Sequence, residues 1–205
     1  MIKVVAHPII EHNLSILRDK LSSNAEFRSS THTIAHFLAA KAFETLDLRP
    51  KQVETPFEQI DGAEISTDVV LVPVLRAGLG LLEAFRALLP AAKISFIGLS
   101  RDEKDFSISE YFFSLPKFSS QTKFIILEVM IATGGSVCSA LSRLQFEEAA
   151  NFTVCSIISA PEGIERILSE HPNVEIITAS LDRELNSKKY ILPGLGDAGD
   201  RWCGV

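Results

Sequence analysis

The sequence predicts an α/β protein whose mainly parallel, twisted sheet is flanked by helices. Apolar runs of strand length alternate with segments of helical period, which is the pattern of such a sheet. The strongest run, from Asp68 to Leu75, is almost continuously apolar, as expected for a strand buried on both faces. We expect a single domain over residues 1–205, because a chain of this length buries about 70% of its unfolded surface.

The remaining elements follow in chain order. A helical segment after the first strand spans Leu79 to Leu89, and a second helix carries apolar residues on one face from Val137 to Leu144. A third helix, Pro161 to Leu168, begins with Pro at a first-turn position. The other expected strands are Lys93–Leu99, Phe124–Leu127, Phe152–Ile158 and Val174–Ala179. Five strands fit a doubly wound sheet.

Two segments interrupt this alternation. The stretch from Ser100 to Phe113 is polar and then aromatic, which fits either a long hairpin or a flexible flap, and we favour the flap. The stretch from Tyr190 to Asp200 holds three Gly and two Asp, too many for the interior of a helix or strand. We expect a defined loop there, because the segment has apolar anchors: Tyr190, Ile191, Leu192, Leu195 and Trp202.

Composition excludes several kinds of partner. A formal charge of −6, from 20 basic and 26 acidic residues, argues against nucleic acid or an anionic membrane. No run of 18 apolar residues and no signal-peptide cleavage site is present, so we expect a cytoplasmic protein without a membrane partner.

The cysteines and histidines do not predict a metal site. The three cysteines are widely spaced and have no His cluster beside them, which argues against a disulfide framework or a zinc site. Cys138 is expected to be a small core residue. His32 and His36 are four residues apart on a predicted helix but have no third ligand, so we expect structural or surface roles.

The segment Ala132-Thr-Gly-Gly-Ser136 is a candidate phosphate loop between a strand and a helix. Its backbone N–H groups would point outward at the positive end of the helix, and Thr133 and Ser136 add hydroxyl donors. The alternative is an ordinary tight turn in which Gly135 permits a positive φ. The segment is neither a Walker A loop nor a dinucleotide fingerprint.

Two charged residues are expected at the ligand-binding edge of the sheet. Glu128 lies at the end of the strand that precedes the phosphate loop, where a carboxylate accepts hydrogen bonds from sugar hydroxyls. Arg76 follows the strand ending at Leu75, and its guanidinium suits a pair of phosphate oxygens. The alternative for Glu128 is a solvated carboxylate at the strand end. The alternative for Arg76 is a surface ion pair at the start of a helix.

The segment Gly196-Asp-Ala-Gly-Asp200 has two interpretations. Clustered Gly and Asp suggest a metal loop, although calcium-loop spacing is absent. The other interpretation is a loop whose backbone binds the edge of a planar ligand, for which Gly allows close approach.

Taken together, these segments resemble the uracil phosphoribosyltransferase family over the whole chain. The matching motifs are VPVLRAGLG, MIATGGS, SAPEGI and, most specifically, YILPGLGDAGDR. The resemblance implies a type I phosphoribosyltransferase fold with a small base-binding hood and a flexible flap. It also implies transfer of ribose 5-phosphate from phosphoribosyl pyrophosphate (PRPP) to uracil, giving UMP and pyrophosphate.

The resemblance also implies roles for individual residues. Catalytic roles fall to Arg76, Arg101 and Asp197, and uracil binding to Ile191, Gly196, Asp197 and Ala198. The residues implied in PRPP binding are Arg76, Ala77, Arg101, Glu128, Val129, Met130, Ile131, Ala132, Thr133, Gly134, Gly135, Ser136 and Asp197. Mg²⁺ would be held by PRPP rather than directly by the protein. A homodimer or higher homo-oligomer is expected, with GTP as a candidate effector.

The chain departs from the family pattern beside the phosphate loop. Glu128-Val129 stands where the family has Asp-Pro, Leu38 to Ala42 replaces the usual Leu-x-Tyr-Glu-Ala, and the flap segment lacks the usual prolines. The alternative function is therefore a weakly active or inactive relative that binds UMP or PRPP as a regulatory sensor.

Overall fold

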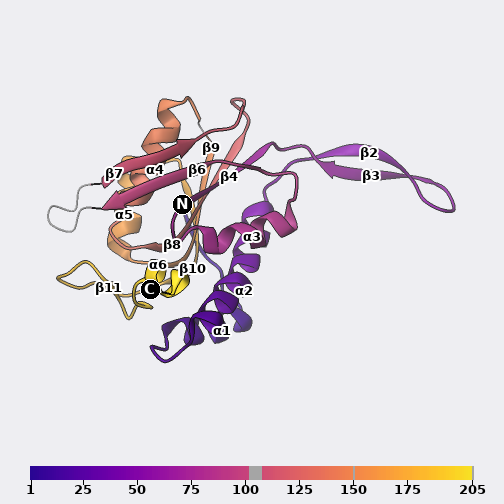
Figure 1. Ribbon diagram of the computed structural model, residues 1–205. Coiled ribbons are helices and arrows are strands. Elements are labelled where there is room, and N and C mark those ends of the chain that lie inside the picture. Colours follow the sequence, from indigo (N-terminus) through magenta and orange to yellow (C-terminus); the bar gives the residue numbers. More distant parts are fainter. Residues whose placement is uncertain (102–107, 150, 205) are drawn as a thin grey trace.

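The computed structural model describes residues 1–101, 108–149 and 151–204, and its centre is an eight-stranded sheet in the order β1-β10-β9-β8-β4-β6-β7, with β5 paired to β4 (Figure 1). All pairs are parallel except β6 with β7. The strands of this sheet are β1 (Ile2–Val4), β4 (Val69–Leu75), β5 (Lys93–Ile94), β6 (Phe96–Arg101), β7 (Ile108–Ser114), β8 (Lys123–Ile131), β9 (Asn151–Ser159) and β10 (Glu175–Leu181). The mainly parallel sheet is thus confirmed.

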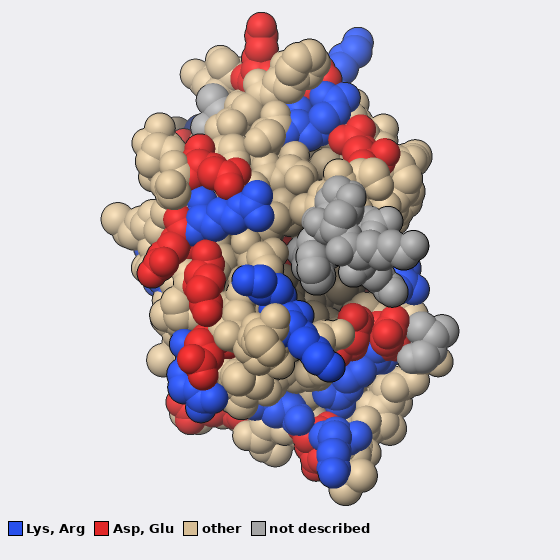
Figure 2. Space-filling view, turned by 90° about the vertical axis from the view of Figure 1, so that its left-hand side faces the viewer, with Lys and Arg blue, Asp and Glu red and all other residues tan. Residues whose placement is uncertain are grey.

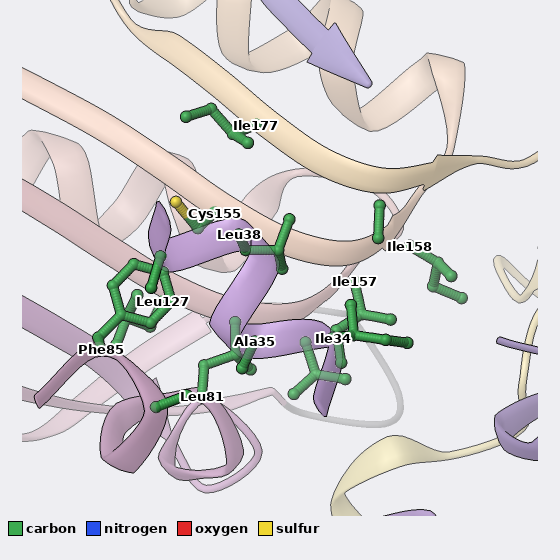
Figure 3. Close-up of a cluster of buried hydrophobic side chains, with 14 of the residues drawn as sticks. Ile34, Ala35, Leu38, Leu81, Phe85, Leu127, Cys155, Ile157, Ile158 and Ile177 are labelled. Carbon is green, nitrogen blue, oxygen red and sulfur yellow. The ribbon is translucent and has the colours of Figure 1, made fainter. Parts of the chain in front are cut away.

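Helices cover both faces of the sheet. One face packs against α1 (Pro8–Arg18), α2 (Asn24–Phe43) and α3 (Leu79–Leu88), and the other against α4 (Gly135–Phe146) and α5 (Pro161–Glu170). Figure 3 shows the first layer, where α2 and α3 side chains meet those of β8, β9 and β10. Along β4, Val69 and Leu71 face this layer while Val70 and Val72 face the other. Burial on both faces explains the continuous apolar run.

The strand order places a topological switch point between β4 and β8. After β4 the chain crosses through α3 to β6 on one side, whereas β8, β9 and β10 extend from the other side of β4. Ligands of open α/β sheets bind in the crevice outside the carboxyl ends of strands at such a point. The loops that follow β4 and β8 are therefore brought together where a ligand is expected.

Several predicted boundaries need correction. The strand expected over Lys93–Leu99 is divided at Ser95, which is fully buried and donates its hydroxyl to the Ser114 carbonyl at 2.6 Å. The described residues form a hairpin, because β6 and β7 pair antiparallel up to Arg101 and Ile108, and the flexibility expected of a flap stays a prediction. The centre of that segment, residues 102–107, lies outside the described residues.

The C-terminal segment, residues 184–204, is more regular than the sequence indicates. It contains β12 (Ile191–Leu192), paired with β11 (Glu184–Leu185), and the short helix α6 (Ala198–Cys203). Ile191 and Leu195 are buried, which confirms them as anchors, but Tyr190 is 56% exposed and is not one.

An antiparallel hairpin, β2 (Leu48–Glu54) with β3 (Gln59–Ile65), extends away from the body of the molecule (Figure 1). We call it the arm. Neither the arm nor β1 is predicted from the sequence.

The surface that Figure 2 presents carries acidic and basic side chains interspersed. Among the described residues, no helix combines the length and the apolar character that crossing a membrane requires.

Candidate active site

The phosphate loop connects β8 to α4 and depends on a left-handed glycine. Gly134 is the N-cap residue of α4 and has a φ of 75°, so the positive φ expected at Gly135 belongs instead to Gly134. A Cβ on Gly134 would lie 2.7 Å from the Gly163 carbonyl oxygen on α5. The loop therefore packs closely against the start of α5, and the first N–H groups of α4 remain available to an anion.

A cavity of about 180 Å³ lies where three segments meet: the phosphate loop, the loop that follows β4 (residues 76–78, the β4 loop) and the C-terminal segment. Its lining includes Ala77 after β4 and Ala198 at the start of α6. Most of the remaining lining comes from β8 and the phosphate loop: Glu128, Met130, Ile131, Ala132, Thr133, Gly134, Gly135, Ser136 and Val137. The structure thus places most of the expected PRPP-binding residues around one space.

Glu128 faces this cavity from within β8 rather than from the strand end. The strand continues to Ile131, and its last part alternates, with Glu128 and Met130 partly exposed while Val129 is buried. The Glu128 carboxylate accepts a hydrogen bond from the Val129 N–H at 3.0 Å. Val129 contributes its backbone beside the site, while its side chain packs into the core.

Arg76 follows the end of β4, the strand beside β8. It lines neither this cavity nor a second one formed mainly by residues 189–196. Its side chain is 59% exposed and approaches the Asp200 carboxylate at 3.6 Å, a long contact between two solvated groups. The Leu75–Arg76 peptide bond is cis. A Cβ on Gly78 would collide with the Leu127 carbonyl oxygen, so the β4 loop packs directly against β8.

A second cavity of about 250 Å³ shares Met130 and Ala132 with the first. Its other lining residues come from the C-terminal segment: Lys189, Tyr190, Ile191, Pro193, Gly194, Leu195 and Gly196. Two of the expected base-binding residues, Ile191 and Gly196, are among them. Ala198 lines the first cavity, so the residues expected to bind the base surround two adjoining spaces.

A partly buried ion pair that the sequence does not reveal holds this segment in place. Arg18 donates to both carboxylate oxygens of Asp182, at 2.8 and 2.6 Å, and to the Gly194 carbonyl at 2.8 Å. The Gly194 N–H donates to Asp182 at 3.0 Å. Burial opposes ionisation of Asp182, but the hydrogen bonds from Arg18, Ser180 and Gly194 outweigh it and keep the pKa of its carboxyl below the usual value.

The start of α6 is fixed by its own polar contacts. Asp197 is the N-cap residue and accepts a hydrogen bond from the Asp200 N–H at 2.9 Å. Arg201 donates to the Leu195 carbonyl at 2.8 Å and stacks over the Phe27 ring at 4.5 Å. In the structure Asp197 is thus a helix cap that lines neither cavity, and its expected contact with PRPP remains a prediction.

Arg101, the second expected arginine, ends β6, and the structure describes only its backbone. A larger cavity of about 450 Å³ lies on the α5 side of the phosphate loop, lined by Ile108, Thr133, Gly135, Glu162, Arg166, Leu185, Asn186 and Lys189. It contains neither the β4 loop nor Glu128 nor the start of α6. The smaller cavity therefore fits the expected substrate site better, despite its size.

Comparison with known proteins identifies the relatives of this chain. A family model described as uracil phosphoribosyltransferase matches residues 4–204. Proteins of that name from Fervidobacterium nodosum and Salinibacter ruber are 42% and 37% identical, covering 98% and 100% of this chain and 98% and 97% of the relatives.

Solved structures agree with these relatives. A protein from Aquifex aeolicus superposes with a TM-score of 0.95 at 33% identity, covering 100% of this chain and 99% of its own. Adenine phosphoribosyltransferase from Trypanosoma brucei gives a TM-score of 0.60 at 12% identity, over 92% of this chain and 87% of that one, which shows a shared fold.

Proposed function

The chain belongs to the uracil phosphoribosyltransferase family, and we propose that its phosphate loop, Arg76 and C-terminal segment form the site where PRPP and uracil react. The protein is a pentosyltransferase with the type I phosphoribosyltransferase fold, and it converts PRPP and uracil to UMP and pyrophosphate. The relatives do not favour the alternative of an inactive regulatory sensor.

The observation that carries the proposed site is the cavity shared by three separate segments. Ala77, the loop from Ala132 to Ser136, and Ala198 lie around one space at the switch point of the sheet. We assign the 5-phosphate of PRPP to the N–H groups at the start of α4, because an anion is stabilised at a helix N-terminus. The ribose then lies beside Glu128, whose carboxylate can accept hydrogen bonds from its hydroxyls.

The pyrophosphate is assigned to the β4 loop. Arg76 and the Ala77 backbone lie next to the cavity, and Arg76 is loosely paired, so little is lost when it turns to a phosphate. Displacement at the ribose C1′ builds positive charge on the sugar and negative charge on the departing pyrophosphate. Arg76 and Arg101 would stabilise the departing group, and the reaction needs no covalent intermediate with the protein.

Mg²⁺ fits this site as part of the substrate. The cavity carries the negatively charged carboxylate of Glu128, which suits a substrate that brings a cation with it. The ligands of Mg²⁺ would be oxygens of PRPP itself, the hard oxygen ligands that this ion accepts. When bound, Mg²⁺ neutralises charge on the pyrophosphate.

Uracil is assigned to the cavity of the C-terminal segment. Ile191 and Gly196 line this cavity and Ala198 lines the adjoining one, which supports binding of the edge of a planar base by their backbone groups. Arg18 and Asp182 hold Gly194 from both its N–H and its carbonyl, so they would position this backbone without touching the base.

The arm supports a homodimer. Its side chains are nearly all exposed, including the apolar residues Leu48, Val53, Phe57, Ile60 and Ile65, and Phe57 is 97% exposed. An isolated two-stranded hairpin is only marginally stable in water. We therefore propose that a second copy of the chain covers the arm, and that sedimentation of a Phe57→Asp variant shows a shift toward monomer. GTP as an effector and a cytoplasmic location stay predictions.

The direct test is to incubate the protein with uracil and PRPP and to follow UMP and pyrophosphate. Both products should appear in equal amounts, and only when a divalent cation is present. A protein that binds UMP in a thermal-shift assay but forms no UMP over hours would support the sensor instead.

A further inference from the structure

Three metal-ligating side chains meet between α4 and α5, away from both substrate cavities. Cys138 lies in the first turns of α4, Glu170 is the last residue of α5, and His171 is the C-cap residue of that helix. One donor atom from each lies within 4.8 Å of the other two. None of the three lines either substrate cavity.

His171 gives the second, independent observation. Its side chain is 5% exposed, and neither ring nitrogen has a hydrogen-bond partner among the described residues. Buried polar groups in folded proteins almost always have a partner. An imidazole with two unpartnered nitrogens, next to a thiol and a carboxylate, is therefore suited to a ligand that the protein itself does not supply.

We propose that Cys138, His171 and Glu170 bind one Zn²⁺ ion through Sγ, a ring nitrogen and a carboxylate oxygen, with water as the fourth ligand. Zinc accepts this mixture of sulfur, nitrogen and oxygen in tetrahedral geometry, and three protein ligands with one open position are common. A thiolate ligand discriminates against Mg²⁺, which prefers oxygen. The site is thus distinct from any Mg²⁺ that accompanies PRPP.

The proton balance and the route of entry are both consistent with this site. Burial and the neighbouring Glu170 carboxylate raise the pKa of the Cys138 thiol to about 12, so the thiol keeps its proton without metal. When Zn²⁺ forms its bond to sulfur, the S–H bond breaks and the proton leaves to solvent. Glu170 is 44% exposed, pairs with the surface residue Arg166 at 2.7 Å and also hydrogen-bonds to the Cys138 thiol, so its carboxylate already faces the cluster and this side of the cluster is open to solvent.

Occupancy would join two helices that meet at the phosphate loop. The Cys138 N–H donates to the Gly134 carbonyl at 2.9 Å, and Gly134 itself packs against Gly163 of α5. A metal bond between α4 and α5 adds a link to this contact. Because the ion binds the folded protein, Zn²⁺ should raise the melting temperature.

The first test uses Co²⁺ as a spectroscopic probe for the metal-free protein. We expect one equivalent to give the thiolate charge-transfer absorption and tetrahedral ligand-field bands, and Zn²⁺ but not Mg²⁺ to displace it. Cys138→Ser should abolish the charge-transfer band. Cys203→Ser, which removes an exposed cysteine elsewhere, should leave it unchanged. No thiolate band, or a band lost only in Cys203→Ser, would overturn the proposal.

The second test does not depend on changing a buried residue. Glu170→Gln alters an exposed side chain and should weaken Zn²⁺ binding in calorimetry by about ten-fold or more, the scale seen when groups supporting a metal are removed. The control is His36→Gln, which disrupts the only adjacent histidine pair on the described α2 surface, His32 with His36. Loss of Zn²⁺ binding in the control, with Glu170→Gln unchanged, would assign the ion to α2 and refute the site.

Discussion

Replacing Gly134 with Ala tests the phosphate loop most sharply. Gly134 has a φ of 75°, and a Cβ there would lie 2.7 Å from the Gly163 carbonyl oxygen, closer than the 3.4 Å at which ordinary contacts begin. The neighbour is backbone at the start of α5 and cannot move aside as a side chain would. Either the loop shifts by several tenths of an ångström or α5 does.

The Gly134→Ala substitution has two separate costs, one in stability and one in activity. The left-handed conformation costs an L-residue roughly 1–2 kcal/mol, which should lower Tm by roughly 2–8 °C in a chain of this size. The displacement acts on function, since misplacing a positioned group by about 1 Å can cost about a hundred-fold in rate. We therefore expect kcat/KM for PRPP to fall about 10- to 100-fold in Gly134→Ala.

The matched control is Gly204→Ala. Gly204 has a φ of 79°, but its close neighbour is the end of the Asn24 side chain, which can move. Its Tm should fall by a similar amount while kcat/KM for PRPP stays near wild type. Steady-state kinetics at saturating uracil measure the difference. If Gly134→Ala keeps the wild-type kcat/KM, or if both variants lose the same activity, the phosphate loop does not bind PRPP as described.

The other predictions concern the residues around this loop. Arg76→Ala should remove a contact of roughly 1.5–3 kcal/mol, raising KM for PRPP about ten-fold or more while UMP affinity changes little; equal losses would indicate a structural arginine. Glu128→Asp should turn over more slowly than wild type and Glu128→Gln more slowly still; a much faster Glu128→Asp would show that the native carboxylate is misplaced. Asp182→Asn should lower Tm by roughly 5–10 °C at pH 7, through loss of a charged hydrogen bond, and raise KM for uracil. Folding lowers the pKa of Asp182, so the stabilisation that its carboxylate provides is present above about pH 4 and is lost as the pH falls through the lowered pKa. The melting curves of variant and wild type should therefore converge in acid. A constant difference in Tm would contradict the ion pair.

The central strands could be predicted because both of their faces are buried. In β4, every residue from Val69 to Val74 is buried and its valines and leucine pack into one helical layer or the other, so burial alone produces a continuous apolar run. The end of β8 is different, because Glu128 and Met130 face a cavity instead of a helix. Polar residues at a ligand-facing strand end look like a loop in sequence, and the strand was predicted too short for that reason.

The arm could not be predicted from local burial. Its strands place apolar residues among charged ones, as in Leu48-Arg-Pro-Lys51, and nearly all of its side chains are exposed. An alternation of apolar and polar residues indicates a strand only where one face of that strand is buried by the same chain. If a second copy covers the arm, its apolar residues are explained by an interface that one sequence does not show.

The candidate site was predictable where its residues form a local motif. The phosphate loop and the Gly-rich C-terminal segment are short strings rich in glycine, and the structure gives Gly134 and Gly196 positive φ angles, although the sequence pointed to Gly135 rather than Gly134. Arg18 and Asp182 lie 164 positions apart, and only the folded chain brings them together. Positioning residues of this kind carry no local signal.

The most direct measurement of the central claim is a crystal structure of the protein with UMP. We predict that the phosphate lies within hydrogen-bond distance of the backbone N–H groups from Thr133 to Ser136, with the uracil ring in the cavity of the C-terminal segment, against Ile191 and Gly196. A phosphate held instead between Arg166 and Lys189, in the larger cavity on the α5 side of the loop, would contradict the assigned site.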